Sequence, residues 1–446
     1  MSKVNILFDK KGCPLAVSGL RFFASTTTWQ KHNEEPRASF RLKDIDFVSW
    51  GNDNRRPDEQ VRVIGRTGVL STAVGFKART SFGQGVVGYE FGGYDESGNE
   101  ILKPYPQQEV REFLESYKFL RYADRAFRDL FKFGNAFPIF YFNAAGKIVN
   151  IITRNARHCR LSVDKKKLLV YPRFDEGDPT DPDTYEIIDM LDEDDPFLDL
   201  MTRKAAGKID FKKPLAYPRL CNYYSNTDYY GVPDWDAALK AGWIDVANKV
   251  PQFLIQSYQN AMSMMWHIQI PLSWYDKHFP AADYVGIEGG TQKREEDIAE
   301  FFDLLEEQMT GEEGAQKALF SEYGFDPLNK DDKWHIERLE NELDAKERLN
   351  TSAAANSEIL FSMMINPSTL GAGMPGGSYA GNSGSGSDIR ESYLVSVITT
   401  YIEKQQVLFP VRLMFQFNGF ENLVLRFKET ILTTLNTGNS KEDITT

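Results

Sequence analysis

Two glycine clusters are the segments of this sequence whose residue types and spacing could bind a nucleotide. GQGVVG at 83–88 and GAGMPG at 371–376 both match the G-x-G-x-x-G fingerprint for a dinucleotide pyrophosphate. That chemistry needs a strand before the glycines and a helix directly after them, because the helix N-terminus holds the phosphates. A helical pattern precedes both clusters; the first then enters a strand pattern and the second runs on into more glycine. The context therefore argues against a dinucleotide site.

Residues for nucleophilic or metal chemistry are scattered along the chain. The five histidines show no H-E-x-x-H or H-x-H spacing, and the three cysteines (Cys13, Cys159 and Cys221) fit neither a zinc site nor a disulfide framework. His158 and Cys159 are adjacent and could be a metal or nucleophile pair, or a structural pair at a strand edge. P-loop and G-x-S-x-G motifs are missing from the sequence. We therefore predict that the protein is not an enzyme, with no catalytic, cofactor-binding or metal-ligating residues and no cofactor.

Length and charge limit the remaining classes. A chain of 446 residues predicts two to four structural units, and the three separated cysteines favour a reducing compartment. The formal net charge of −12 argues against tight binding of nucleic acid, because that affinity comes largely from Lys and Arg on phosphates. The N-terminal segment lacks the apolar region of a signal peptide, and no run approaches a membrane span. We expect cytoplasm-like conditions and no membrane partner.

An acidic segment runs from Asp175 to Asp195, with eleven Asp or Glu residues and no Lys or Arg. It could be a cation site, a surface that repels DNA, or a solvated loop, and its spacing does not match a calcium-binding loop. Five basic residues follow between Arg203 and Lys213, and they could face it.

Periodicity predicts the elements that position these residues. Helical patterns are expected at 59–81, 109–119, 121–134, 293–309 and 334–364, in a helix capped by Asp234 that runs to about Trp266, and at 388–408, where Pro410 stops the last helix. Residues 1–60 look poor in strands, with Asp53 or Asn54 near a helix cap. Strands are expected at 135–142, 147–152, 159–163, 167–173 and 184–190, in a hairpin at 86–101, and in VRLMFQFNG and NLVLRFKE near the end. Residues 267–290 look irregular and strand-like.

Four stretches, taken in order, resemble portal proteins of tailed bacteriophages. They are FVSWGNDNRRPDE (47–59), YYGVPDWDAALKAG (229–242), NPSTLGAG (366–373) and DIRESYLVSVITTYIEKQQ (388–406), and the likeness extends over roughly residues 40–430. The resemblance implies a ring, usually of twelve copies, at one capsid vertex, through which double-stranded DNA is packaged and ejected. It implies as partners the terminase large subunit, a head–tail adaptor, and the major capsid protein or scaffold. The protein would be found in the virion, and in the host cytoplasm during assembly.

Two alternative functions remain open at this point. One is another head–tail connector or minor capsid protein, and the other is a DNA-processing enzyme whose site is not recognised.

The resemblance also implies an α+β fold of several parts. It maps 1–235 to an α/β wing, 236–265 to stem helix 1, 266–333 to a small α/β clip, 334–365 to stem helix 2, 366–387 to a tunnel loop, 388–409 to a tunnel helix, and 410–446 to strands that return to the wing and a short tail. The crown that continues many relatives would be short or missing.

Candidate functional residues follow from this assignment. Seven glycines lie between 371 and 386, and a backbone so rich in glycine can follow a moving duplex, although a surface linker is the alternative. The candidates are Ser378, Tyr379, Asn382, Ser383, Ser385 and Arg390 for the DNA channel, Lys346 and Arg348 as basic residues of the lumen, and Asp297 and Phe301 for partner binding by the clip. For Lys346 and Arg348, salt bridging along the helix is the alternative.

A set of apolar residues on stem helix 1 could close the ring or belong to the core of a single chain. Its members are Trp243, Phe253, Tyr258, Met262, Met264, Met265 and Trp266.

Overall fold

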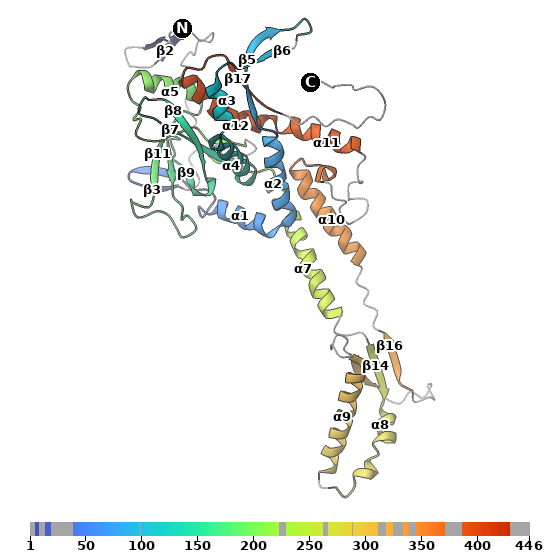
Figure 1. Ribbon diagram of the computed structural model, residues 1–446. Coiled ribbons are helices and arrows are strands. Elements are labelled where there is room, and N and C mark those ends of the chain that lie inside the picture. Colours follow the sequence, from blue (N-terminus) through green and yellow to red (C-terminus); the bar gives the residue numbers. More distant parts are fainter. Residues whose placement is uncertain are drawn as a thin grey trace, which may run out of the picture. The chain divides into compact units, whose positions relative to one another are not determined.

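The computed structural model describes residues 5–8, 14–18, 39–98, 100–222, 229–261, 266–287, 289–310, 318–323, 333–338, 345–370 and 386–428. They form a mixed α+β fold (Figure 1). The chain divides into two compact units. Unit 1 takes Met1–Ile244, Asn356–Met374 and Ala380–Thr446, and the described part of unit 2 lies within Asp245–Ala355. Unit 2 is therefore an insertion into the sequence of unit 1.

Unit 1 is built on a seven-stranded sheet in the order β13-β7-β12-β11-β10-β9, with β8 also paired to β7. The strands are β7 (Asn135–Phe142), β8 (Ile148–Arg154), β9 (Cys159–Leu161), β10 (Lys167–Val170), β11 (Glu186–Met190), β12 (Leu215–Ala216) and β13 (Leu220–Cys221). All pairs are antiparallel except β11 with β12. The apolar run NAFPIF in β7 is buried throughout, as expected for a central strand covered on both faces. The strands expected at 135–142, 147–152, 159–163, 167–173 and 184–190 are confirmed, with shorter bounds for several.

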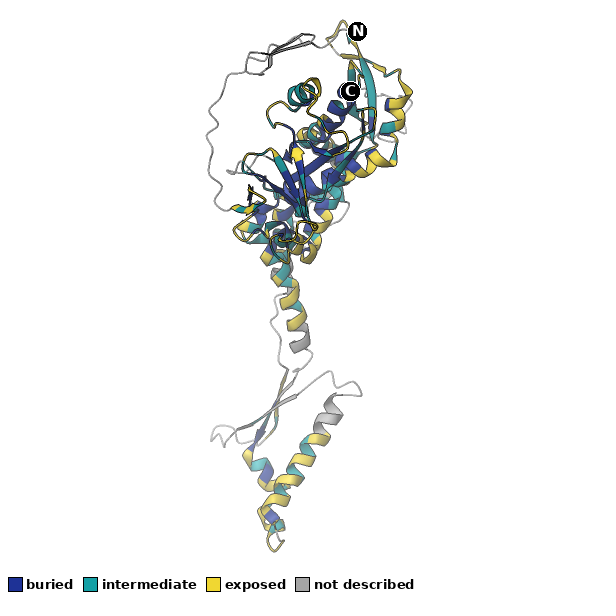
Figure 2. Cartoon of the chain, turned by 90° about the vertical axis from the view of Figure 1, so that its left-hand side faces the viewer, coloured by how far each residue is buried: buried dark blue, intermediate teal, exposed yellow. Residues whose placement is uncertain are grey.

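Helices cover this sheet. Unit 1 contains α1 (Arg56–Arg66), α2 (Gly68–Phe82), α3 (Gln108–Leu114), α4 (Tyr117–Phe133), α5 (Pro196–Ala205), α6 (Asp236–Lys240), α11 (Gly386–Thr399) and α12 (Tyr401–Phe417), with short 3-10 turns η1 (Ala156–His158) and η3 (Pro367–Leu370). α4 packs on β7 and β8, and α2 and α12 pack against α4. Figure 2 shows that the buried residues gather on the sheet and the helices next to it. The apolar face of α4 holds Phe119, Phe127 and Leu130, all buried. This face explains why its periodicity was readable from sequence.

Smaller β-structures complete unit 1. A three-stranded sheet has the order β17-β5-β6, from β17 (Leu423–Phe427), β5 (Val86–Tyr94) and β6 (Glu100–Pro104), which confirms the expected hairpin and the last strand. Two hairpins, β1 (Asn5–Phe8) with β2 (Pro14–Ser18) and β3 (Ser39–Leu42) with β4 (Ile45–Val48), contradict the expectation that the N-terminal sixty residues are poor in strands. Such short isolated pairs leave too little periodicity to detect.

The stretch FVSWGNDN is fixed by a buried aromatic and cationic cluster. The Trp50 ring stacks on Tyr230 at 4.4 Å between centroids. The guanidinium of Arg160, fully buried, lies 3.9 Å from the centroid of Phe174 and donates to the backbone oxygen of Asn54 at 2.7 Å. Each donated bond offsets part of the cost of burying this charge. The cluster links the residues before α1 to strand β9.

Unit 2 has its own core. α7 (Trp243–Ala261) leads into a three-stranded sheet β15-β14-β16, formed by β14 (Trp266–Pro271), β15 (Ala318–Tyr323) and β16 (His335–Arg338). Two helices, α8 (Leu272–His278) and α9 (Gly290–Thr310), and the 3-10 turn η2 (Ala281–Tyr284) accompany it, and α10 (Ala345–Ser362) leads back to unit 1. Ile268, Ile270 and Tyr275 are the buried centre of this core. The helix expected at 293–309 is confirmed as part of α9.

Several expected helices have different bounds. The helix at 59–81 is two helices, because Thr67 is extended between α1 and α2. The helix expected to start at 334 starts at Ala345, and His335–Arg338 is a strand. Of residues 267–290, the first part belongs to strand β14, as expected, whereas Leu272–His278 and Ala281–Tyr284 are helical rather than irregular. The helix that Pro410 was expected to stop continues to Phe417, so VRLMFQF is helical and not a strand.

The helix start expected near Asp53 or Asn54 is confirmed in position, because the N-cap residue of α1 is Arg55, but no side chain caps the helix. The Asn54 side chain instead accepts from the Trp50 N–H at 3.0 Å. Asp234 does not cap a helix either: its carboxylate pairs with Lys77, and α6 starts at Asp236 without a side-chain cap. Both side chains serve tertiary contacts, which spacing along the sequence cannot reveal. Within the described part of the chain, every helix is too short or too polar to cross a lipid bilayer.

Candidate functional site

The glycine-rich segment starts and ends at one anchored point in unit 1. The side-chain amide of Asn366 donates to the hydroxyl of Ser392 on α11 at 2.8 Å, which links the two ends directly. η3, which begins at Pro367, packs against α11. The hydroxyl of Thr369 and its N–H both bind the carbonyl of Asn366, at 2.6 and 3.0 Å. The residues that precede the segment and those that follow it are therefore held together in unit 1.

The entry into this segment is set by an unusual helix end. The N–H of Ile365 bonds the carbonyl of Leu360, and that of Met364 bonds the carbonyl of Phe361, the pattern of a Schellman motif. The residue in the left-handed position is Met364, with φ of 55°, where glycine is usual. Ile365 after it is buried. The chain direction at the end of α10 is therefore fixed despite a strained residue.

The residues proposed for the DNA channel fall mostly outside the described part of the chain. Ser378, Tyr379, Asn382, Ser383 and Ser385 lie there, as does the GAGMPG cluster. Arg390 lies in the first half of α11 and is half-buried. Their assignment stays a prediction.

The two basic residues proposed for the lumen belong to the start of α10. Lys346 and Arg348 lie in the first turn of this helix, which begins at Ala345, and their side chains are outside the described set. Their role also stays a prediction.

The two residues proposed for partner binding by the clip make contacts within unit 2. The hydroxyl of Tyr284 donates to Asp297 at 2.8 Å, and this bond raises the pKa of Tyr284. The ring of Phe301 lies 5.2 Å from that of Trp274 and 6.3 Å from that of Trp334. Both side chains therefore hold α9 against its neighbours, so a substitution at either would change the packing of unit 2 as well as any binding of a partner.

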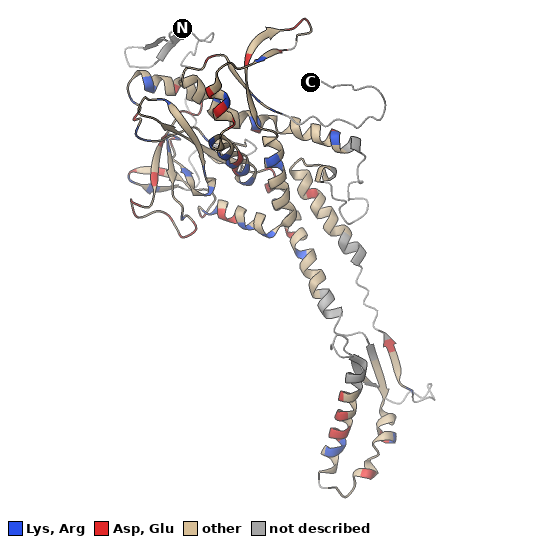
Figure 3. Cartoon of the chain, in the orientation of Figure 1, with Lys and Arg blue, Asp and Glu red and all other residues tan. Residues whose placement is uncertain are grey.

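The exposed charged residues of α9 are mostly acidic, and Asp and Glu lie along much of this helix (Figure 3). Its exposed residues include Glu295, Glu296, Glu300 and Asp303, together with Leu304, which is 54% exposed. If α9 meets a partner, these side chains are the ones available to it. Sequence periodicity placed them on the helix but did not separate them from Asp297 and Phe301.

For the helix expected at 236–265, the two described members of the apolar set differ in exposure, and the choice between a ring contact and an internal core stays open. Phe253 is 40% exposed and lies on α7, while Trp243 is half-buried. Tyr258, Met262, Met264 and Met265, and the side chain of Trp266, are outside the described set. The predicted helix 236–265 is interrupted at Ala241–Gly242, and the segment from Trp266 is strand β14.

The residues first considered for catalysis lie in structural settings. Burial raises the pKa of the Cys159 thiol and lowers the pKa of His158, which opposes a thiolate–imidazolium pair. Cys159 is on β9, at the edge of the sheet, in agreement with a structural pair. Among the described residues no group of three His, Cys, Asp or Glu side chains could hold a metal ion.

The first glycine cluster belongs to a sheet margin. Gly83 ends α2 and the chain enters β5, and both Gly83 and Gly85 have positive φ. The N–H of Gln84 bonds the carbonyl of Lys428, and the N–H of Lys428 bonds the carbonyl of Gly85. These bonds extend the β5–β17 ladder, so this backbone is engaged in the sheet and not shaped to hold a phosphate.

The acidic segment pairs with basic residues of the same unit. Asp175 pairs with Arg157 at 3.0 Å, and Asp189 with Lys167 at 2.7 Å. Glu193 pairs with Arg219 at 2.9 Å. Among the basic residues between Arg203 and Lys213, Arg203 contacts this segment, because its guanidinium donates a hydrogen bond to the Met190 carbonyl. These acidic residues are paired within unit 1, and Glu186–Met190 of the segment is strand β11 rather than a loop.

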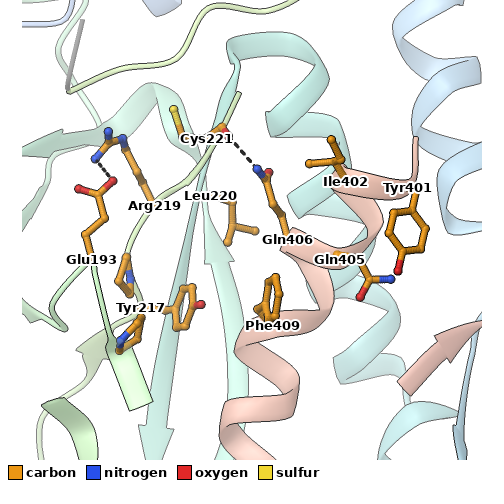
Figure 4. A pocket seen from close by; sticks show the side chains of 12 residues that line it. Glu193, Tyr217, Arg219, Leu220, Cys221, Tyr401, Ile402, Gln405, Gln406 and Phe409 are labelled. Atoms are coloured by element: carbon orange, nitrogen blue, oxygen red, sulfur yellow. Dashed lines mark hydrogen bonds and ion pairs between the residues drawn. The ribbon is translucent and has the colours of Figure 1, made fainter. Parts of the chain in front are cut away.

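A pocket of about 450 Å³ lies between α12 and the segment 217–221 (Figure 4). Its walls carry the Arg219–Glu193 ion pair and a hydrogen bond from the side-chain amide of Gln406 to the carbonyl of Cys221 at 2.9 Å. The remaining wall is largely apolar, from Tyr401, Ile402 and Phe409. These side chains suit apolar contact, and the charged groups are already paired.

Comparison with solved structures finds the same fold in particles of a gene transfer agent (GTA). A chain in the neck of an empty GTA particle, computed with C6 symmetry, has a TM-score of 0.52 and 14% identity, with 85% of each chain covered. A chain in the virion of a native GTA particle has a TM-score of 0.53 and 13% identity, over 88% of this chain and 86% of that one. A chain in the neck of a native particle, computed with C12 symmetry, has a TM-score of 0.52 and 12% identity, with 85% of each chain covered.

No protein-family model matches the sequence, and no curated protein matches it. The chain shares the α+β fold of these particle components over most of its length.

Proposed function

We propose that this chain is the portal protein of a tailed-phage-like particle. Twelve copies would form a ring at one capsid vertex, through which double-stranded DNA enters and leaves. The observation that carries this proposal is the fold likeness over 85% of both chains to a chain in a neck computed with C12 symmetry. A protein that acts through its ring needs no catalytic residues of its own, and ATP hydrolysis would belong to a terminase.

The closed base of the glycine-rich segment supports a tunnel-loop role. The Asn366–Ser392 bond would hold both ends of the segment fixed while the residues between them follow the duplex. The candidate residues there are uncharged apart from Arg390, so they would touch phosphates without releasing many counterions. Deleting 373–386 should leave ring assembly intact and reduce DNA packaging or retention. Loss of assembly in this variant would contradict the tunnel-loop assignment.

The acidic side of α9 is the proposed contact of the clip with the terminase large subunit and then the head–tail adaptor. The major capsid protein or scaffold would surround the part formed by residues 1–235. The ring would assemble in the host cytoplasm and then be part of the virion.

The proposal is tested first by the assembly state. Twelve copies of a 50.9 kDa chain give a particle of about 610 kDa. Native mass spectrometry should find this mass, and averaged electron micrographs should show a ring with a central hole. A protein that stays monomeric at high concentration would count against a portal.

A second candidate is a different ring component of the neck, because the similar chains come from necks and virions. The two candidates differ in when they act. Without a portal, particles should fail to fill with DNA, whereas without an adaptor, filled heads should form and then lose DNA or fail to join tails. The experiment deletes this gene from a host that produces the particles and measures the DNA in the heads that form. Restoring the gene is the control, and the DNA content without it separates the two candidates.

A further inference from the structure

α11 and the first half of α12 expose apolar side chains and bury polar ones. Between residues 392 and 411 every exposed side chain is apolar, and together they form what we name the apolar stripe: Leu394 (54% exposed), Val395 (56%), Ile398 (72%), Tyr401 (53%), Ile402 (68%) and Phe409 (49%). The buried face of the same helices carries Ser392, Ser396, Thr400 and Lys404, spaced by four residues. This is the reverse of the usual pattern for a surface helix.

The buried polar face is satisfied within unit 1. The hydroxyl of Ser396 donates to the carbonyl of Ser392 at 2.9 Å, and that of Thr400 donates to the carbonyl of Ser396 at 2.9 Å. The hydroxyl of Ser392 accepts from Asn366. α11 packs with this face toward its own unit, against α2 and η3. The outward direction of the stripe is therefore fixed by contacts inside the unit.

The stripe extends over both helices, which meet at Thr400. α11 ends at Thr399 and α12 begins at Tyr401; at this junction the N–H of Thr400 bonds the carbonyl of Ser396, and the N–H of Lys404 bonds the carbonyl of Thr400. At 100° per residue, Leu394, Val395 and Ile398 fall within an arc of about 100° on α11, and Tyr401, Ile402 and Phe409 fall within an arc of about 100° on α12. The stripe contains no Lys, Arg, Asp or Glu, and α11 carries no charge after Glu391 (Figure 3).

The exposed area of the stripe is large for a monomer. With these exposed fractions, six side chains of this size present roughly 700 Å², close to the ~800 Å² that each partner contributes to a standard protein interface. Contiguous apolar patches of more than a few hundred Å² mark interaction sites. The area is too large for a small ligand, and the missing positive charge excludes nucleic acid as the occupant.

We infer that the stripe is the surface on which the neighbouring copy of this chain packs in the ring. This inference rests on the proposed function, because a closed ring places one face of each copy against a different face of the next. Phe409, Tyr401 and Ile402 also form one wall of the pocket in Figure 4, so side chains of the neighbouring copy have a depression to fill. Buried apolar anchors in such depressions carry most of the energy of an interface.

The test places charges on the stripe and compares them with charges elsewhere. The double variant Ile398→Asp/Ile402→Asp should stay folded, since both side chains are exposed in the single chain, and should raise the concentration for half-assembly at least about 100-fold. The matched control is Ile101→Asp/Val149→Asp, whose residues are 40% and 42% exposed on β6 and β8. Native mass spectrometry across a dilution series measures both. Rings of normal stability from the stripe variant would overturn the inference while leaving the proposed function intact.

A labelling measurement avoids the need for a disruptive substitution. Ile402→Cys should react with a maleimide in dissociated monomers and become at least about tenfold slower in assembled rings, whereas Ile101→Cys should react equally in both. Equal reactivity of Ile402→Cys in both states would overturn the inference. Protection already present in the monomer would place another part of the same chain over the stripe and would overturn it too. Failure of the wild-type protein to form any ring would instead reject the proposed function.

Discussion

A buried ion pair in unit 1 provides the most direct test of the structure. The ammonium of Lys77, on α2, lies 2.6 Å from the carboxylate of Asp234, and these side chains are 4% and 6% exposed. Asp234 also accepts from the side-chain amide of Asn222 at 2.8 Å. The Lys77 ammonium lies 5.0 Å from the centroid of the Phe131 ring. The pair ties α2 to the segment that leads into α6 and α7.

The substitution Lys77→Met removes the cation and keeps the aliphatic stem. Asp234 would then be a buried carboxylate that keeps the hydrogen bond from the Asn222 amide but has lost its cation, and uncompensated buried charges of this kind cost about 3–5 kcal/mol. The double variant Lys77→Met/Asp234→Leu removes both charges. It should recover most of that loss, because replacing a whole buried pair by apolar side chains is close to neutral.

Urea unfolding, followed by circular dichroism, measures these differences. The matched control is Arg111→Gln, which breaks the exposed Arg111–Glu115 pair (77% and 64% exposed) and should leave the free energy of unfolding almost unchanged. If Lys77→Met is as mild as Arg111→Gln, then Asp234 is not buried as described. If the double variant is as unstable as the single one, uncompensated charge is the wrong explanation.

Three further outcomes are expected. Burial raises the pKa of Asp129 from 3.8 to about 7. The stability that its protonated carboxyl contributes is therefore fully present below about pH 4 and is lost as pH rises through about 7, a decrease of up to about 4 kcal/mol. Asp129→Asn should remove this decrease from unfolding free energies measured between pH 4 and 8. Met364→Gly should raise thermal stability by up to about 1 kcal/mol, since φ is 55° there, and a lower melting temperature would refute the Schellman assignment. Phe301→Ala should destabilise unit 2 by about 2 kcal/mol in hydrogen exchange, whereas Glu296→Gln, exposed on the same helix, should leave it unchanged.

Helices and strands whose own sequence carries the full hydrophobic pattern were predicted well. α4 and α9 have apolar residues at helical spacing with charges on the other face, and β7 is a short apolar run next to a turn. In these elements the side chains that decide the structure are neighbours in sequence. Periodicity is then sufficient evidence.

Elements decided by distant contacts were not predicted. Ile336 keeps helical spacing with the leucines after it, yet it pairs with Ile268 in the β14–β16 ladder, and that partner is far away in sequence. Pro410 should end a helix, but α12 continues because Val407, Val411 and Met414 are buried on one face. Burial of such a face can outweigh the roughly 3 kcal/mol that a proline costs a helix.

In the candidate site, too, features set by neighbouring residues were predicted and features set by distant contacts were not. Composition alone identified the glycine-rich segment, but the bond between Asn366 and Ser392 that closes its base joins residues 26 apart. The proposed clip residue Phe301 was chosen from a helical pattern that could not distinguish a contact inside the unit from a contact with a partner. Contacts that join separate elements require the fold.

The two helices after this segment show why periodicity alone cannot assign a surface. Ile398 and Ile402 lie on one face and Ser396 and Thr400 on the other, so the sequence predicts an amphipathic helix whose apolar face points inward. In the structure the polar face is buried, because small hydroxyl side chains bond their own backbone and need no water. A face of that kind gains little from burial within one chain, whereas the exposed isoleucines gain much when covered. Such a helix reaches its lowest free energy only when a further surface covers the apolar side, which is the physical reason to expect assembly here.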